Sequence, residues 1–184
     1  SGTSTSGSVV DIATGVLANA GISDGKKVNN NLPQILSLGA EYKVLPELAV
    51  MVDGNIYFLS KADMNGTEDY IGTGWEAGFG AKYQVMPVLT VGVGYMYTVQ
   101  SAKDKYFNSE ATFLNAAGNP PLDSHTFGLG ATYTVIENLD LTLAGAWTHY
   151  LPEEYSFEHS KIGAVSGEYK KDVYNIGIGV GYKI

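Results

Sequence analysis

The side chains most able to do chemistry are three histidines that lie among carboxylates in charged stretches of the chain. They are His125, His149 and His159, and each has an aspartate or glutamate within a few residues. Imidazole and carboxylate groups bind zinc, but the sequence has no cysteine and no pair of histidines four residues apart. We therefore expect no metal site and interpret these residues as solvated loop charges.

A serine, histidine and carboxylate triad is the other chemistry to consider. His149 is the nearest candidate, with Ser156 and Glu153 in the stretch that follows it. Proximity in sequence does not define the geometry that a triad needs, and no glycine-rich phosphate loop that opens a helix is present. We assign no catalytic residue and expect a protein that is not an enzyme and that carries no cofactor.

Composition excludes further classes. The 184 residues hold eleven lysines, no arginine and nineteen carboxylates, for a net charge of −8. Nucleic-acid binding is not expected, because it depends on clustered basic side chains. Glycine, at 23 residues, is well above its usual share of ~7%, and there are 13 tyrosines. This composition argues against a helical bundle, where glycine is costly, and against disorder, where aromatic residues are scarce.

The dominant pattern is alternation with a period of two, which predicts β-strands. In the clearest run, Leu89, Val91 and Val93 face one way while Thr90 and Gly92 face the other. Seven such runs follow one another, at residues 36–43, 48–58, 75–84, 89–100, 126–133, 139–148 and 174–184. The longest exceed the ~5–6 residues of soluble strands and match the ~9–11 residues that cross a bilayer at a tilt.

The connections between the runs alternate in length. Those at 44–47, 85–88 and 136–138 are tight, whereas those at 61–70, 101–123 and 151–171 are long and charged. Short turns at one end and long loops at the other are typical of outer-membrane barrels. Aromatic residues on the apolar face form two expected belts about 20 Å apart, near the ~25 Å apolar band of such barrels. The belts comprise Tyr42, Tyr83, Tyr133 and Tyr182 near the turns, and Trp75, Tyr95, Tyr97 and Trp147 near the loops.

A soluble antiparallel sandwich or lipocalin-like barrel, with the apolar face inward, is the competing interpretation. Its outer face would be rich in lysine and glutamate. The second face of these runs is instead mostly glycine, threonine and alanine, with a charge or two per strand. That composition favours an apolar face that contacts lipid and a small-residue face that lines an interior.

A weak repeat points to a family. Residues 38–42 read Leu-Gly-Ala-Glu-Tyr, and similar segments begin at Phe79, Leu129 and Ile178. Asn31-Leu32-Pro33 precedes the first segment, which is followed by a tight turn and a long strand. In this style, residues 32–184 resemble the FadL family of outer-membrane transporters of hydrophobic compounds. The resemblance implies a transmembrane antiparallel β-barrel of fourteen strands with an N-terminal plug. This all-β chain, with seven strands, would be the last half of it.

The same resemblance assigns residues 1–31 to an external loop with a short amphipathic helix, ahead of the strands in 32–184. Family members carry apolar external helices that first dock hydrophobic ligands. In this sequence the residues with suitable helical spacing are Val9, Val10, Ile12, Val16 and Leu17. A lid in the 101–123 loop would use Phe107, Phe113 and Leu114.

We therefore expect passive transport of hydrophobic small molecules, such as long-chain fatty acids, across the bacterial outer membrane. The expected partners are outer-membrane lipid, a hydrophobic ligand, and the remaining barrel strands, supplied by a missing part of the protein or by another chain. Two alternatives stay open. One is a structural or partner-binding barrel, such as an adhesin or a secretion-system component, and the other is a small general porin.

Overall fold

The computed structural model describes residues 31–63, 67–110, 112–113 and 119–182. The expected external helix, with Val9, Val10, Ile12, Val16 and Leu17, lies outside the described residues, as does Leu114. Within the described part, no helix is long and apolar enough to cross a membrane.

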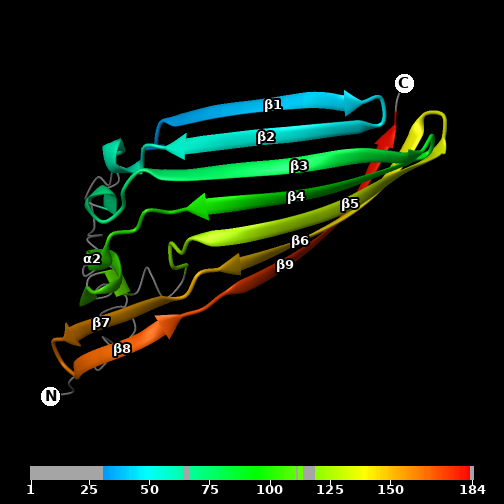
Figure 1. Cartoon of the computed structure of the whole chain (residues 1–184). Helices are drawn as coiled ribbons and strands as arrows, with labels where there is room; N and C mark the ends of the chain where they lie inside the picture. The colour runs from blue at the N-terminus through cyan, green and yellow to red at the C-terminus, as the bar shows by residue number, and fades with distance from the viewer. Residues whose placement is uncertain (1–30, 64–66, 111, 114–118, 183–184) are drawn as a thin grey trace, which may run out of the picture.

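Seven antiparallel strands form one curved sheet, as the alternation predicts (Figure 1). The sheet order is β1-β2-β3-β4-β5-β6-β9, so consecutive strands are neighbours except where β9 follows β6. The strands are β1 (Ile35–Leu45), β2 (Leu48–Tyr57), β3 (Gly74–Met86), β4 (Leu89–Val99), β5 (Ser124–Ile136), β6 (Leu139–Tyr150) and β9 (Asp172–Tyr182). Every strand of this sheet has ten to thirteen residues, which confirms the lengths that the sequence predicts.

Three tight turns close one end of the sheet, which we call the turn end. Each leaves two residues between strands, at 46–47, 87–88 and 137–138, and each has a register shift just before the turn. Pro46 and Pro87 occupy the first turn position, where a fixed φ favours the turn. Neighbouring turns are joined, because the Gln84 amide donates to the Glu47 carbonyl over 2.8 Å.

The opposite end, here the loop end, is more elaborate. It holds the 3-10 helices η1 (Leu59–Lys61) and η2 (Thr67–Asp69), the short helix α2 (Asp104–Phe107), and a separate two-stranded sheet. That sheet pairs β7 (Glu153–His159) with β8 (Gly163–Tyr169), and it extends beyond the end of β6 (Figure 1). The segment 151–171, which the sequence predicts to be a long charged loop, contains this hairpin instead.

On each of the seven strands, alternate side chains are mostly apolar, and together these side chains form the apolar face of the sheet. This face is exposed, since no second layer of described residues covers it. Leu129 is 70% exposed, Leu143 59% and Ile178 81%. The soluble-sandwich alternative required these side chains to share a buried core, and the described residues form no such core. Five of the six buried apolar side chains among the described residues lie outside the seven-stranded sheet, at the loop end; Ala49 is the exception.

Aromatic rings run across the apolar face near the loop end. Trp75 contacts Tyr97 with ring centroids 5.7 Å apart, Tyr95 contacts Phe127 at 5.1 Å, and Phe127 stacks on Trp147 at 5.7 Å. Trp147 in turn stacks on Tyr174 at 6.5 Å. Polar groups border this row. The Tyr95 hydroxyl lies 2.7 Å from His125 Nδ1, and the Trp147 indole donates to Asp172 over 2.9 Å. The row therefore combines apolar ring surface with polar groups on its loop side.

Candidate functional site: the loop-end cluster and the small-residue face

Among the described residues there is one hydrophobic core cluster, and it lies at the loop end. Its buried members are Tyr106, Phe107 and Leu122, and partly buried side chains surround them. We call this group the loop-end cluster; the surrounding residues are Tyr70, Ile71, Ala102, Tyr150, Tyr155 and Tyr169. Since these residues come from all three long connections and from the end of β6, the cluster joins segments far apart in the sequence.

Aromatic ring contacts join the three long segments at the loop end. Tyr106 of α2 meets Tyr70 at 6.5 Å, and Phe107 meets Tyr169 of β8 at 6.1 Å. Tyr155 of β7 lies 4.7 Å from Tyr169 across the hairpin. Backbone bonds reinforce these contacts, because the Lys103 amide donates to the Tyr70 carbonyl over 2.9 Å. The cluster holds the loop end together as one packed unit.

Two of the three predicted lid residues, Phe107 and Phe113, lie within the described residues, and both pack at the loop end. Phe107 is only 5% exposed and belongs to the buried core of the cluster. Phe113 packs against Tyr155 at 5.5 Å and Phe157 at 5.0 Å. Their ligand contact stays a prediction. The tyrosine partners were not predicted from the sequence, although Tyr155 and Phe157 alternate with polar residues, which is a strand signal inside a charged stretch.

Polar side chains that follow α2, Asn108 and Glu110, bind the edge of β7 and the turn after it. We call this set of hydrogen bonds the clamp. The Ser156 amide donates to Asn108 Oδ1 over 2.8 Å, and the Ser160 amide donates to Glu110 Oε2 over 3.1 Å. The Ser160 hydroxyl also donates to Glu110, and His159 Nε2 lies 3.5 Å from the same carboxylate. These bonds occupy amides on an edge that would otherwise be open for pairing.

Electrostatics at the loop end favour the protonated or neutral state of several groups. Burial, together with Asp104, Asp123 and Glu154, raises the pKa of Glu153 above its ordinary value. Burial also raises the pKa of the Tyr106 and Tyr169 hydroxyls. Among the described residues, no group of three or more histidines and carboxylates is arranged to hold a metal ion.

The second face of the sheet, the small-residue face, is lined by glycine, alanine and threonine. Its register places Gly80 beside Gly94, Gly94 beside Gly128, and Gly128 beside Ala146. A parallel row runs through Gly92, Gly130, Ala144 and Gly177. From β4 to β6 these two rows carry no large side chain.

Polar side chains on this face bond across the strands. Thr126 pairs with Thr148 and Thr132 with Thr142, each over 2.9 Å. Near the loop end Glu76 accepts bonds from Asn55 and Tyr57, and near the turn end Lys82 lies 3.0 Å from Glu41. The face therefore combines a shallow glycine-rich centre with polar groups toward both ends, which suits a water-accessible or ligand-lined interior better than lipid.

Comparison with known proteins gives one informative result at the level of structure. No family model and no curated protein matches the sequence. The structure matches a crystal structure of a Pseudomonas aeruginosa FadL homologue with a TM-score of 0.64 and 15% sequence identity. The match covers 82% of this chain and 35% of that chain, so this chain spans about a third of the length of the FadL homologue. The sheet has a FadL-like fold.

The packing of Tyr155 generates a first prediction. A Cβ at Gly167 would lie 2.5 Å from the Tyr155 hydroxyl oxygen and 2.7 Å from Cζ, so Gly167→Val must displace the ring from the cluster. We expect a cost of about 1–3 kcal/mol, as in other overpacked sites, and at least tenfold faster amide exchange in β7 and β8. Ser166→Val, on the opposite face of β8, is the matched control. Equal exchange in the two variants would contradict this account.

The clamp generates a prediction about pH. The hydrogen bond from the Ser160 amide, supported by the Ser160 hydroxyl and His159, lowers the pKa of Glu110 from its ordinary value of 4.5. The folded pKa is below the unfolded one, so the clamp is fully stabilised above pH ~4.5 and weakens as the pH falls through the lowered pKa.

Titration of the Glu110 carboxyl carbon by NMR measures this directly. The midpoint should lie below 4.5 in the unmodified protein and move upward in Ser160→Ala, which removes the hydroxyl donor. Ser166→Ala, a hydroxyl deletion on the other strand of the hairpin, should leave the midpoint in place. A midpoint at or above 4.5 in the unmodified protein would show that the clamp does not form.

Proposed function

We propose that the chain is part of an outer-membrane barrel that lets hydrophobic small molecules, such as long-chain fatty acids, cross the membrane without an energy source. The observation that carries the proposal is the likeness of the seven-stranded sheet to the FadL homologue over 82% of this chain. Three features of the molecule support it: the exposed apolar face, the unpaired sheet edges and the small-residue face.

The apolar face supports a position in a bilayer. Monomeric soluble proteins rarely expose apolar patches beyond a few hundred Å². Here exposed apolar side chains occur on every strand of the sheet, from Leu38 at 73% on β1 to Ile176 at 83% on β9. The aromatic row, with polar partners such as Asp172 and His125 on its loop side, matches the girdles found where barrels meet the membrane surface.

The sheet edges support additional strands from elsewhere. Among the described strands, β1 and β9 each have a neighbour on one side only, and an unpaired backbone group in lipid costs several kcal/mol. With seven antiparallel strands, both edge strands run from the loop end to the turn end. Antiparallel closure therefore needs partner strands that run the opposite way at both edges. A second copy of this sheet in the same orientation would meet each edge in parallel, so we propose that a different segment completes the barrel.

The small-residue face supports passage of a ligand. Rows of glycine and alanine would leave the interior wide enough for a plug or a ligand beside the wall. Apolar contact supplies about 25 cal/mol per Å² of buried surface, so a long acyl chain gains several kcal/mol on binding. This affinity suits capture from water followed by release.

One observation favours a second candidate, a partner-binding barrel. The β7–β8 hairpin extends from the loop end, and Ile162 at its tip is 74% exposed. An exposed apolar tip on a two-stranded ribbon suits contact with another protein. In that case stoichiometric protein binding, and not ligand uptake, would depend on Ile162.

Uptake of labelled oleate by cells that display the complete barrel tests the proposal. Ile12→Asp combined with Val16→Asp should lower the initial uptake rate about tenfold at limiting oleate, because a loss of ~1.4 kcal/mol of binding corresponds to tenfold. Ile162→Asp, an apolar-to-acidic change on an exposed loop residue, is the control and should retain uptake.

Surface amounts of each variant must be matched by gel shift of the folded barrel. Unchanged uptake in the double variant would contradict the proposal that residues 9–17 dock the ligand. Absence of barrel-dependent uptake in the unmodified protein would overturn the transport proposal itself.

A further inference from the structure

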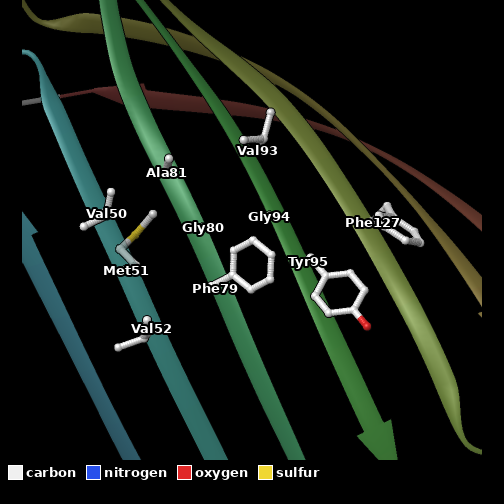
Figure 2. Close-up of a pocket in the computed structure, with 10 residues that line it drawn as sticks. All are labelled: Val50, Met51, Val52, Phe79, Gly80, Ala81, Val93, Gly94, Tyr95 and Phe127. Atoms are coloured by element: carbon white, nitrogen blue, oxygen red, sulfur yellow. The ribbon is translucent and has the colours of Figure 1, made fainter.

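The apolar face of the sheet contains a hollow of about 630 Å³ over β2, β3, β4 and β5, which we call the wall hollow (Figure 2). Seven of its ten lining residues have the apolar parity. No charged side chain lines it, and its volume lies within the ~300–1,000 Å³ typical of small-molecule sites.

The strand register explains why the wall is hollow here. One row of side chains crosses the sheet as Val50, Ala81 and Val93, and the next row crosses as Val52, Phe79, Tyr95 and Phe127. The residues between these two rows belong to the small-residue face, so Gly80 and Gly94 present only backbone to the apolar face. Ala81 is the small member of its row, and its methyl group leaves a depression beside the Phe79 ring.

Rings close the side of the hollow toward the loop end. Tyr95 lies 5.3 Å from Phe79 and 5.1 Å from Phe127, so the three rings form a continuous wall. The Tyr95 hydroxyl is 2.7 Å from His125 Nδ1, and this bond satisfies the polar group of the ring. The hollow therefore offers apolar contact without a polar anchor, which suits a hydrocarbon segment.

The occupant must come from the membrane side of the wall. Phe79 and Val93 line the hollow and are each 62% exposed, so the hollow opens onto the apolar face. The ladders that join β2 to β5 have no register shift in this part of the sheet, so a ligand on the small-residue face has no opening to the hollow.

We propose that the wall hollow binds one acyl chain of a membrane lipid. The inference rests on the membrane position proposed above, but it assigns a lipid site on the outside of the wall, separate from any transport path. A bound chain would cover the depression over Ala81 and complete the packing between the two side-chain rows.

Photolabelling tests the site. The complete barrel is reconstituted in phosphatidylethanolamine vesicles that contain a trace of phospholipid with a diazirine midway along one acyl chain, and adducts are mapped after irradiation. Labelling of residues 79–81 and 93–95 should exceed that of 141–143, on the same apolar face, at least threefold. Ala81→Leu fills the hollow and should remove this excess.

Ala131→Leu is the matched control. Ala131 lies on the same face and at the same position of the Gly-Ala repeat, between Val91 and Leu143, but it does not line the hollow. It should leave the labelling excess unchanged. Ala81→Val is a milder second variant in case the leucine disturbs folding, and it should lower the excess in part.

The outcomes separate this site from the proposed function. Equal labelling of all apolar-face strands, or an excess that survives Ala81→Leu, would overturn the site and leave the membrane position intact. Labelling by a diazirine fatty acid but not by the phospholipid would also overturn it, since the occupant would then be cargo. An absence of labelling on every strand would remove the membrane position, and the site with it.

Discussion

An amide or carbonyl group inside a bilayer has no water to bond with, so every backbone group of a spanning strand must find a partner in a neighbouring strand. In the membrane position that we propose, this constraint accounts for the long antiparallel ladders from β1 to β9 and for their nearly unbroken register between the turns. Among the described strands, none pairs with the outer edge of β1 or of β9. Inside a bilayer, a sheet with such edges would be complete only as part of a closed wall, and the sheet is similar to a segment of a larger FadL homologue.

The two faces of that wall have different physical roles. On one face, large apolar side chains stand exposed because the surrounding solvent, in our proposal, is lipid. On the other, rows of glycine and alanine keep side-chain volume low while threonine pairs and the Glu76 cluster satisfy polar groups. Packing that a soluble domain would place in its centre is found here at the loop end, where Tyr106, Phe107 and Leu122 bind three connections together.

Much of this architecture can be predicted from the sequence, because alternation with a period of two shows which residues lie on each face of a strand. The seven strands and three tight turns follow from it, and the structure confirms them. The β7–β8 hairpin was missed because Glu153, Glu154 and Glu158 give the segment the composition of a loop, although Tyr155 and Phe157 alternate within it. The loop-end cluster and the wall hollow depend on which residues become neighbours across strands. That information lies in the register and not in any single run.

The central claim is that the apolar parity contacts lipid while the other parity faces an interior, and site-directed spin labels along β6 test it most directly. Labels at 141, 142, 143 and 144 in the reconstituted barrel are compared for collision with oxygen, which concentrates in lipid, and with a water-soluble nickel complex. The account predicts high oxygen accessibility at 141 and 143 and a two-residue alternation in which 142 and 144 have the opposite preference. High nickel accessibility at 141 and 143, or no alternation at all, would contradict it.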